Sequence, residues 1–120
     1  MKAEVIRHQR AQETLTAERC FISEMVNDGD QGISIAQARV EPGITTAWHE
    51  LDGVNEHYVI LSGEGKMELG KAKPKSVKAG DVVCIPAGTR QRITNTGLRD
   101  LVFLCICQPG FSEKCYKSLE

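Results

Sequence analysis

Residues 43–63 read GITTAWHELDGVNEHYVILSG and residues 80–95 read GDVVCIPAGTRQRITN, and these two stretches decide the fold. Each places particular residues at fixed distances: Gly43-x5-His49-x-Leu51-x4-Glu56-x6-Gly63 in the first, and Gly80-x5-Pro86-x-Gly88-x2-Gln91-x3-Asn95 in the second. Short segments rich in valine, isoleucine and threonine run between these positions. Such segments, bounded by glycine and proline, are typical of β-strands joined by tight turns.

The two patterns together resemble the two sequence motifs of the cupin superfamily. The first family motif reads Gly, His-x-His, Glu, Gly, and the second reads Gly, Pro, Gly, His, Asn. The chain keeps every spacing and changes two letters, because Leu51 stands where the second histidine is expected and Gln91 where the third is. The resemblance covers roughly residues 33–107. It implies an all-β fold, a double-stranded β-helix or jelly-roll barrel, in a single cupin domain.

A chain of 120 residues has room for one domain. Within it we predict an N-terminal arm with edge strands at 1–32, the barrel core at 33–108 and a C-terminal tail at 109–120. Turn signals separate eight expected strands, at 21–26, 33–40, 45–49, 57–61, 65–69, 81–85, 91–94 and 101–107. A polar surface connection is expected at 71–75. Residues 11–19 are compatible with a short helix or an irregular arm, and 112–119 with one or two helical turns.

The charge balance favours a small-molecule partner. Lys and Arg total 15 against 16 for Asp and Glu, so the net charge of −1 offers no basic excess for nucleic acid or an anionic membrane. No apolar run approaches the ~20 residues of a membrane helix, and the first ten residues lack the apolar segment of a signal peptide. We therefore expect a cytoplasmic protein. Its five cysteines, without an export signal, favour reduced thiols.

The resemblance also implies a ligand set for a metal. His49 would supply an imidazole, Glu56 a carboxylate and Gln91 an amide oxygen, a set that favours a divalent transition metal such as Mn²⁺, Fe²⁺, Zn²⁺ or Ni²⁺. Metal affinity is expected to be lower than in the family's three-histidine version, because Gln91 adds no charge and Leu51 no donor atom. The alternative is a pocket without metal, in which the three polar side chains bond to one another or to a ligand.

Strand alternation predicts which neighbours share the interior, since successive side chains point to opposite faces. With His49 and Glu56 inside, Leu51, Tyr58 and Ile60 are expected inside as well.

Alternation sends other candidates outward. His57, next to Glu56, ligates a metal only if the strand bulges, and Trp48, Arg90 and Arg92 are expected on the outer face. Cys105 and Cys107 share one strand face, either as small buried hydrophobes or as thiols that face the cavity near the metal.

The leading hypothesis is a small cytosolic cupin that binds one divalent metal and acts on a small organic substrate, as a dioxygenase, isomerase or cyclase. Glu56 and Tyr58 are the catalytic candidates. The competing hypothesis is a non-catalytic module that stores or senses a small ligand in the same cavity. A barrel that only binds protein partners is disfavoured, because it would bury three polar side chains without use. The resemblance further implies a homodimer, since cupins commonly cover exposed strand edges by pairing two barrels.

Overall fold

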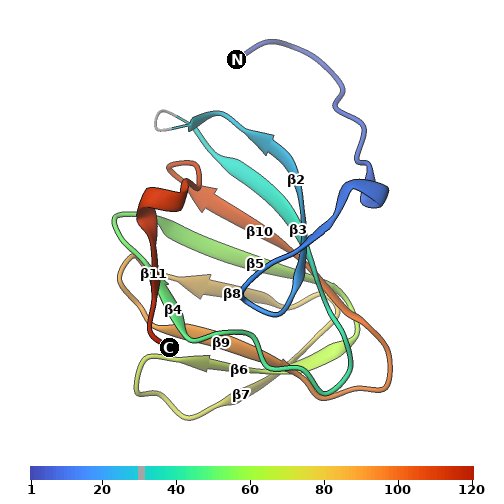
Figure 1. The fold of residues 1–120 in the computed structure, drawn as a ribbon, viewed down its shortest axis with the longest axis vertical. Helices are drawn as coiled ribbons and strands as arrows, with labels where there is room; N and C mark the ends of the chain where they lie inside the picture. Colours follow the sequence, from blue (N-terminus) through green and yellow to red (C-terminus); the bar gives the residue numbers. More distant parts are fainter. Residues whose placement is uncertain (30–31) are drawn as a thin grey trace.

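Two antiparallel sheets face each other and curl into a barrel in the computed structural model, which describes residues 1–29 and 32–120 (Figure 1). The first sheet has the order β1 (Thr14–Leu15), β2 (Phe21–Asn27), β3 (Ser34–Val40), β10 (Leu101–Gln108), β5 (Asn55–Ser62) and β8 (Val82–Ile85). The second has the order β11 (Tyr116–Ser118), β4 (His49–Leu51), β9 (Gln91–Asn95), β6 (Glu64–Leu69) and β7 (Lys75–Lys78). This is the double-stranded β-helix that the sequence predicted.

One expected strand, 45–49, is wrong in its bounds. Thr45 forms only an isolated bridge to Thr94, and β4 begins at His49. The cause lies at Thr46, whose backbone N–H donates to the Ile93 carbonyl at 2.9 Å while its hydroxyl accepts the Ile93 N–H at 3.0 Å. A side chain thus takes the place of a backbone acceptor and interrupts the ladder.

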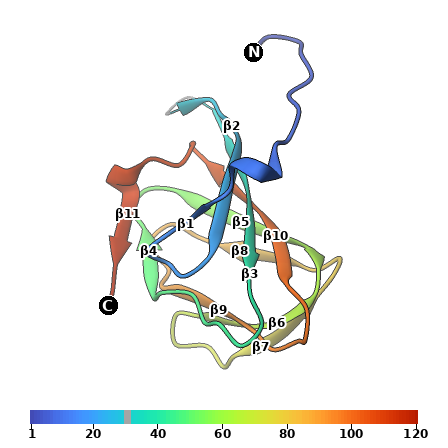
Figure 2. The same ribbon diagram turned by 45° about the vertical axis from the view of Figure 1, so that its right-hand side comes forward.

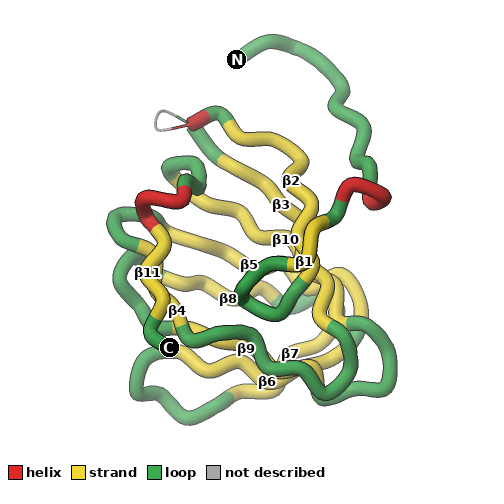
Figure 3. The backbone as a smooth tube through the Cα atoms, viewed as in Figure 1, coloured by secondary structure: helices red, strands yellow, loops and turns green. Residues whose placement is uncertain are grey.

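The ends of the chain differ most from expectation. Residues 11–19 contain both a short 3-10 turn, η1 (Arg10–Gln12), and the strand β1. The predicted helical turns at 112–119 shrink to one 3-10 turn, η3 (Glu113–Cys115), before the chain pairs with β4 as β11 (Figure 3). The expected connection at 71–75 runs into β7, a strand not foreseen because its lysines obscure the alternation. None of the helical turns in the described residues has the length and apolar character needed to cross a bilayer.

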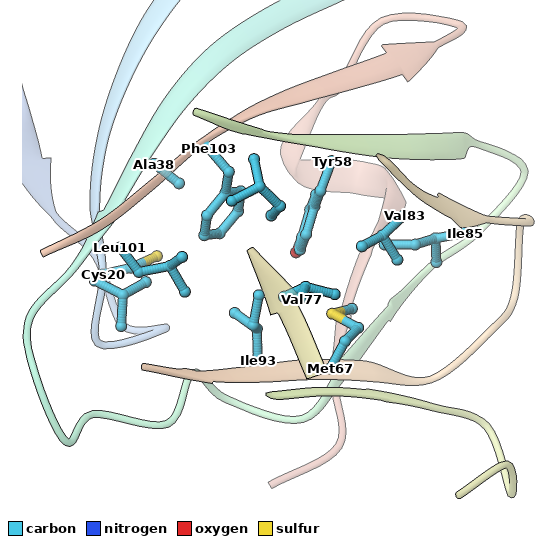
Figure 4. Packing of buried hydrophobic residues seen from close by; sticks show 12 residues of the cluster. Cys20, Ala38, Tyr58, Met67, Val77, Val83, Ile85, Ile93, Leu101 and Phe103 are labelled. Atoms are coloured by element: carbon cyan, nitrogen blue, oxygen red, sulfur yellow. The ribbon is translucent and has the colours of Figure 1, made fainter. Parts of the chain in front are cut away.

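The apolar core lies between the two sheets. Tyr58 and Val83 of the first sheet face Met67 and Ile93 of the second across the barrel (Figure 4). The Tyr58 ring packs against Phe103 with ring centroids 4.4 Å apart. Burial of the inward side chains of β5 and β8 to β10 anchors the strands that carry the motif residues.

The glycine and asparagine of the motifs have structural roles. Gly63 has φ of 88°, and a Cβ there would lie 2.7 Å from the Asp100 carbonyl oxygen, so only glycine fits this turn. Asn95 is 1% exposed, and its amide Nδ2 donates to the carbonyls of Val40 and Arg99, each at 2.8 Å. Its Oδ1 accepts the Gly97 N–H at 2.9 Å. One side chain therefore joins the ends of β3 and β9 to the turn before β10.

We expect Asn95→Ala to lower the free energy of unfolding by about 2–3 kcal/mol, because it leaves buried carbonyl groups without a donor. Urea unfolding monitored by circular dichroism measures this change. Asn55→Ala is the matched control, since Asn55 accepts a single backbone hydrogen bond, from Ala87 at 2.9 Å, at an exposed position. Equal losses for the two variants would contradict the structural role given to Asn95.

Candidate functional site

A cavity of about 180 Å³ opens inside the barrel beside the core. Its walls are mostly apolar and include Ile22, Ala38, Leu51, Phe103 and Phe111. Four carboxyl or imidazole side chains also line it: Glu18, His49 and Glu56, and the solvent-exposed Glu24. Among the described residues no lysine or arginine does. The cavity therefore offers an apolar space with one polar region rich in carboxyl groups.

His49 and Gln91 come together as direct partners across β4 and β9. Their side chains are 3% and 1% exposed, so both lie on the interior face, as predicted. The ring of His49 stacks on Tyr116 at a centroid distance of 5.0 Å, and its Nδ1 lies 2.9 Å from the Ala47 carbonyl. A carbonyl only accepts, so Nδ1 carries the proton in this bond. The lone pair of the neutral imidazole is then on Nε2.

Glu56 enters the cavity from β5 in the opposite sheet and is 6% exposed. Its Oε2 accepts a hydrogen bond from the Cys107 thiol at 3.5 Å, whereas its Oε1 has no partner among the described residues. Burial raises the pKa of Glu56 to about 7, and the nearby Glu18 carboxylate adds to the rise. The Gln91 amide and the Cys107 thiol offset part of it; the amide lies near the carboxyl group, although its Nε2 does not reach hydrogen-bonding geometry. Glu56 is therefore a carboxyl group able to exchange a proton near neutral pH.

The amide of Gln91 is oriented differently from the expectation. The Tyr58 hydroxyl donates to Gln91 Oε1 at 2.8 Å, and Nε2 is the atom left without a partner within the described chain. Gln91 is also absent from the described residues that line the cavity. Its oxygen faces the site only if the amide turns over. Tyr58 permits this, since a hydroxyl can accept from Nε2 as well as donate to Oε1.

Glu18 is the site residue that sequence analysis missed. Its carboxylate Oε2 lies 3.8 Å from His49 Nδ1, and its side chain is 23% exposed. Burial raises the pKa of Glu18, and the charge of a protonated His49 would oppose that rise. Glu18 belongs to the stretch 11–19, which has no alternating pattern and lies outside both motifs. No signal in the sequence marked it.

The outward predictions are confirmed. His57 is exposed. The guanidinium groups of Arg90 and Arg92 lie over the Trp48 ring at 4.0 and 4.4 Å, and Arg92 forms an ion pair with Glu68 at 2.6 Å. These side chains form a surface cluster on the far side of β4 and β9 from the cavity.

Three thiols line the cavity, from Cys20, Cys105 and Cys107. Burial raises the pKa of Cys20 to about 12 and also raises the pKa values of Cys105 and Cys107. The three groups are therefore neutral thiols at physiological pH, and poor nucleophiles. Both alternatives for Cys105 and Cys107 hold in part, since they are packed in the wall and also face the cavity.

The expected metal ligands fit a metal ion in part. His49 Nε2 keeps a lone pair, and Glu56 Oε1 has no partner within the described chain. Gln91 supplies an oxygen only after its amide turns. Within the described residues no three side chains of the His, Cys, Asp and Glu types converge as a ready metal site. A metal at this site would be held by two strong ligands, His49 and Glu56, and by Gln91 only in the turned orientation of its amide.

Comparison with known proteins identifies the family. The model of the cupin domain family matches residues 36–107. The chain belongs to the cupin superfamily.

Two relatives and one solved structure illustrate the match. This cupin is 38% identical over 87 residues to an uncharacterized protein of Methanocaldococcus jannaschii, a match covering 72% of this chain and 69% of that protein. It is 40% identical over 72 residues to an oxalate-binding protein of Thermotoga maritima, covering 59% of this chain and 58% of the relative. A double-stranded β-helix protein of Klebsiella pneumoniae superimposes with a TM-score of 0.80 at 18% identity, over 98% of this chain and 99% of that one, which shows the shared fold alone.

The raised pKa of Glu56 makes stability depend on pH. A carboxyl group with pKa 4.5 when unfolded and about 7 when folded stabilises the protein fully below about pH 4.5, and this contribution is lost as pH rises through about 7. In chelator-treated protein we expect Glu56→Gln to be more stable than the wild type by about 2–3 kcal/mol above about pH 8 and nearly equal to it near pH 4.5. Denaturant unfolding across this range measures the difference. A difference that stays constant with pH would show that Glu56 titrates normally.

Proposed function

We propose that this small cupin binds a compact organic ligand in its barrel cavity and holds a divalent metal at the polar end of that cavity through His49, Glu56 and Gln91. The observation that carries the proposal is Glu56 Oε1, a buried carboxylate oxygen without a partner within the described chain. Leaving such an atom uncompensated in an apolar cavity is costly. A bound cation, or a ligand that donates a hydrogen bond, removes that cost.

The surrounding residues support a metal of the Mn²⁺, Fe²⁺, Zn²⁺ or Ni²⁺ type, which accepts mixed nitrogen and oxygen ligands. When bound, such an ion acts as a Lewis acid toward an oxygen of the ligand. The Ala47 carbonyl fixes the tautomer of His49, and such a hydrogen bond on the second ring nitrogen is the usual support for a metal-binding histidine. Tyr58, expected as a catalytic residue, instead holds Gln91, so we assign it a positioning role. Glu56 remains the candidate for proton transfer.

A second candidate function is a non-catalytic module that binds a ligand without metal. The Tyr58–Gln91 hydrogen bond favours it, because it occupies the amide oxygen and leaves the Nε2 donor without a partner within the described residues. In that case Glu56 and Gln91 would contact the ligand directly.

The metal site is tested by the metal content of tag-free protein, measured by inductively coupled plasma mass spectrometry. We expect near one equivalent of a single transition metal in the wild type and its loss in Glu56→Gln, because that change removes the charged ligand. Gln91→His, which restores the family residue, is expected to bind the metal more tightly in a Mn²⁺ titration. Gln91→Ala is expected to weaken it.

His57→Ala is the control, since His57 is adjacent to Glu56 but exposed. It should keep its metal. A wild-type protein that takes up no added Mn²⁺ or Zn²⁺ would exclude the metal site and favour the metal-free module.

The partner that we propose at β2 is a second copy of the chain. β1 pairs only with Phe21 and Ile22, so most of the outer edge of β2 has no neighbouring strand within the described residues. Val5, Ile6 and Leu15 nearby in the arm are 75%, 52% and 60% exposed. Light scattering after gel filtration is expected to give twice the chain mass of 13.2 kDa. In Leu15→Lys the fraction of protein in the dimer is expected to fall by about half. A monomer in the wild type would contradict the dimer.

A further inference from the structure

The turn between β1 and β2 forms one wall of the cavity. Two backbone bonds close it, from Thr16 N–H to the Cys20 carbonyl at 2.9 Å and from Arg19 N–H to the Thr16 carbonyl at 3.0 Å. Arg19 adopts φ of 70°, a left-handed conformation uncommon for residues other than glycine. This tight turn directs Glu18 into the cavity, whose lining it joins together with Thr16 and Cys20.

Contacts with the chain just before His49 fix this turn in place. The Glu18 carbonyl accepts the Ala47 N–H at 3.2 Å, and Arg19 Nε donates to the Thr45 carbonyl at 2.9 Å. Arg19 also forms two hydrogen bonds of 3.0 Å to the carboxylate of Glu120. Figure 2 shows β1 and this turn beside β4. The backbone position of Glu18 at the cavity wall is therefore set by contacts of the fold.

Glu18 changes the charge of the site. The family motif, with three histidines and one glutamate, leaves a divalent ion with a net charge of +1. Here Glu56 and Glu18 together would balance the ion. Without an ion, two carboxyl groups face the cavity, and among the described residues no lysine or arginine lines it to offset their charge. The buried, unpartnered Glu56 Oε1 shows where a ligand would be received.

We propose that Glu18 selects the ligand by charge: the cavity takes uncharged or cationic molecules that bring an N–H or O–H donor to Glu18, and it disfavours small dicarboxylates such as oxalate. A dianion would lie against the Glu18 carboxylate, with no lysine or arginine of the described lining to offset its charge, and its binding is thereby weakened. The inference rests on the ligand cavity proposed above, but not on the metal. It also separates this chain from the Thermotoga maritima relative, which is named for oxalate.

The test compares oxalate with oxamide, its uncharged diamide of nearly the same shape, by NMR titration of ¹⁵N-labelled protein of known metal content. The wild type is expected to bind oxamide more tightly than oxalate. Glu18→Gln is expected to shift the ratio of the two dissociation constants toward oxalate by about tenfold, because it removes one charge at nearly constant volume. Metal content should be the same in the variant and the wild type.

Glu24→Gln is the matched control, because Glu24 lines the outer part of the same cavity but is exposed to solvent. Water screens its charge, so the ratio should change less than about twofold. If Glu18→Gln fails to fold, Glu18→Met provides the same charge change. An unchanged ratio in a folded Glu18 variant, stronger binding of oxalate than of oxamide by the wild type, or no binding of either probe would each overturn the proposal. Loss of the metal site alone would leave it standing.

Discussion

Burial of the Glu56 carboxyl between two sheets is the constraint on which the site depends. The strand alternation that places Tyr58 and Ile60 in the core also places Glu56 inside, so the barrel cannot keep its packing and expose this group. One oxygen is satisfied only by a weak thiol donor, Cys107, and the other is unpaired within the described chain. The raised pKa is the measurable result. Because the unpaired carboxylate oxygen costs free energy in the folded protein, a cation or a hydrogen-bond donor that pairs with it binds more favourably.

The two ends of the chain complete the site that the barrel begins. The turn at Thr16 to Cys20 docks on Thr45 and Ala47. The carboxylate of Glu120, which is bound to Arg19 of that turn, accepts the Trp48 N–H at 2.8 Å. Both contacts converge on the short segment before His49, where the ladder is interrupted at Thr46. Because the sheet does not hold this segment by regular pairing, the docked ends supply its hydrogen bonds. The direction of His49 therefore depends on residues distant in the sequence.

This division explains what the sequence could predict. Gly63 and Asn95 were recognisable because the local structure requires these residue types at a fixed spacing. Gly63 allows a close approach of the backbone, and Asn95 donates to carbonyl groups that need a partner. The inward directions of Leu51 and Tyr58 followed from the period of two. Glu18 had no such requirement, because its role arises from a contact between the arm and β4. The orientation of the Gln91 amide could not be predicted for a related reason. The spacing locates the side chain, but its hydrogen-bond partner, Tyr58, decides which amide atom faces the site.

The two departures from the family pattern act on charge and shape together. Leu51 replaces a donor by an apolar side chain and packs with Val54, Cys107 and Cys115, so the position has become part of a small hydrophobic cluster. Gln91 keeps a polar group but ties it to Tyr58. The polar region is thereby reduced to one side of the cavity, where His49 and Glu56 meet the added carboxylate of Glu18. A cavity of this kind suits the compact ligand proposed above, with an apolar body and one polar end, since the described residues that line it include no lysine or arginine to pair with a small dianion.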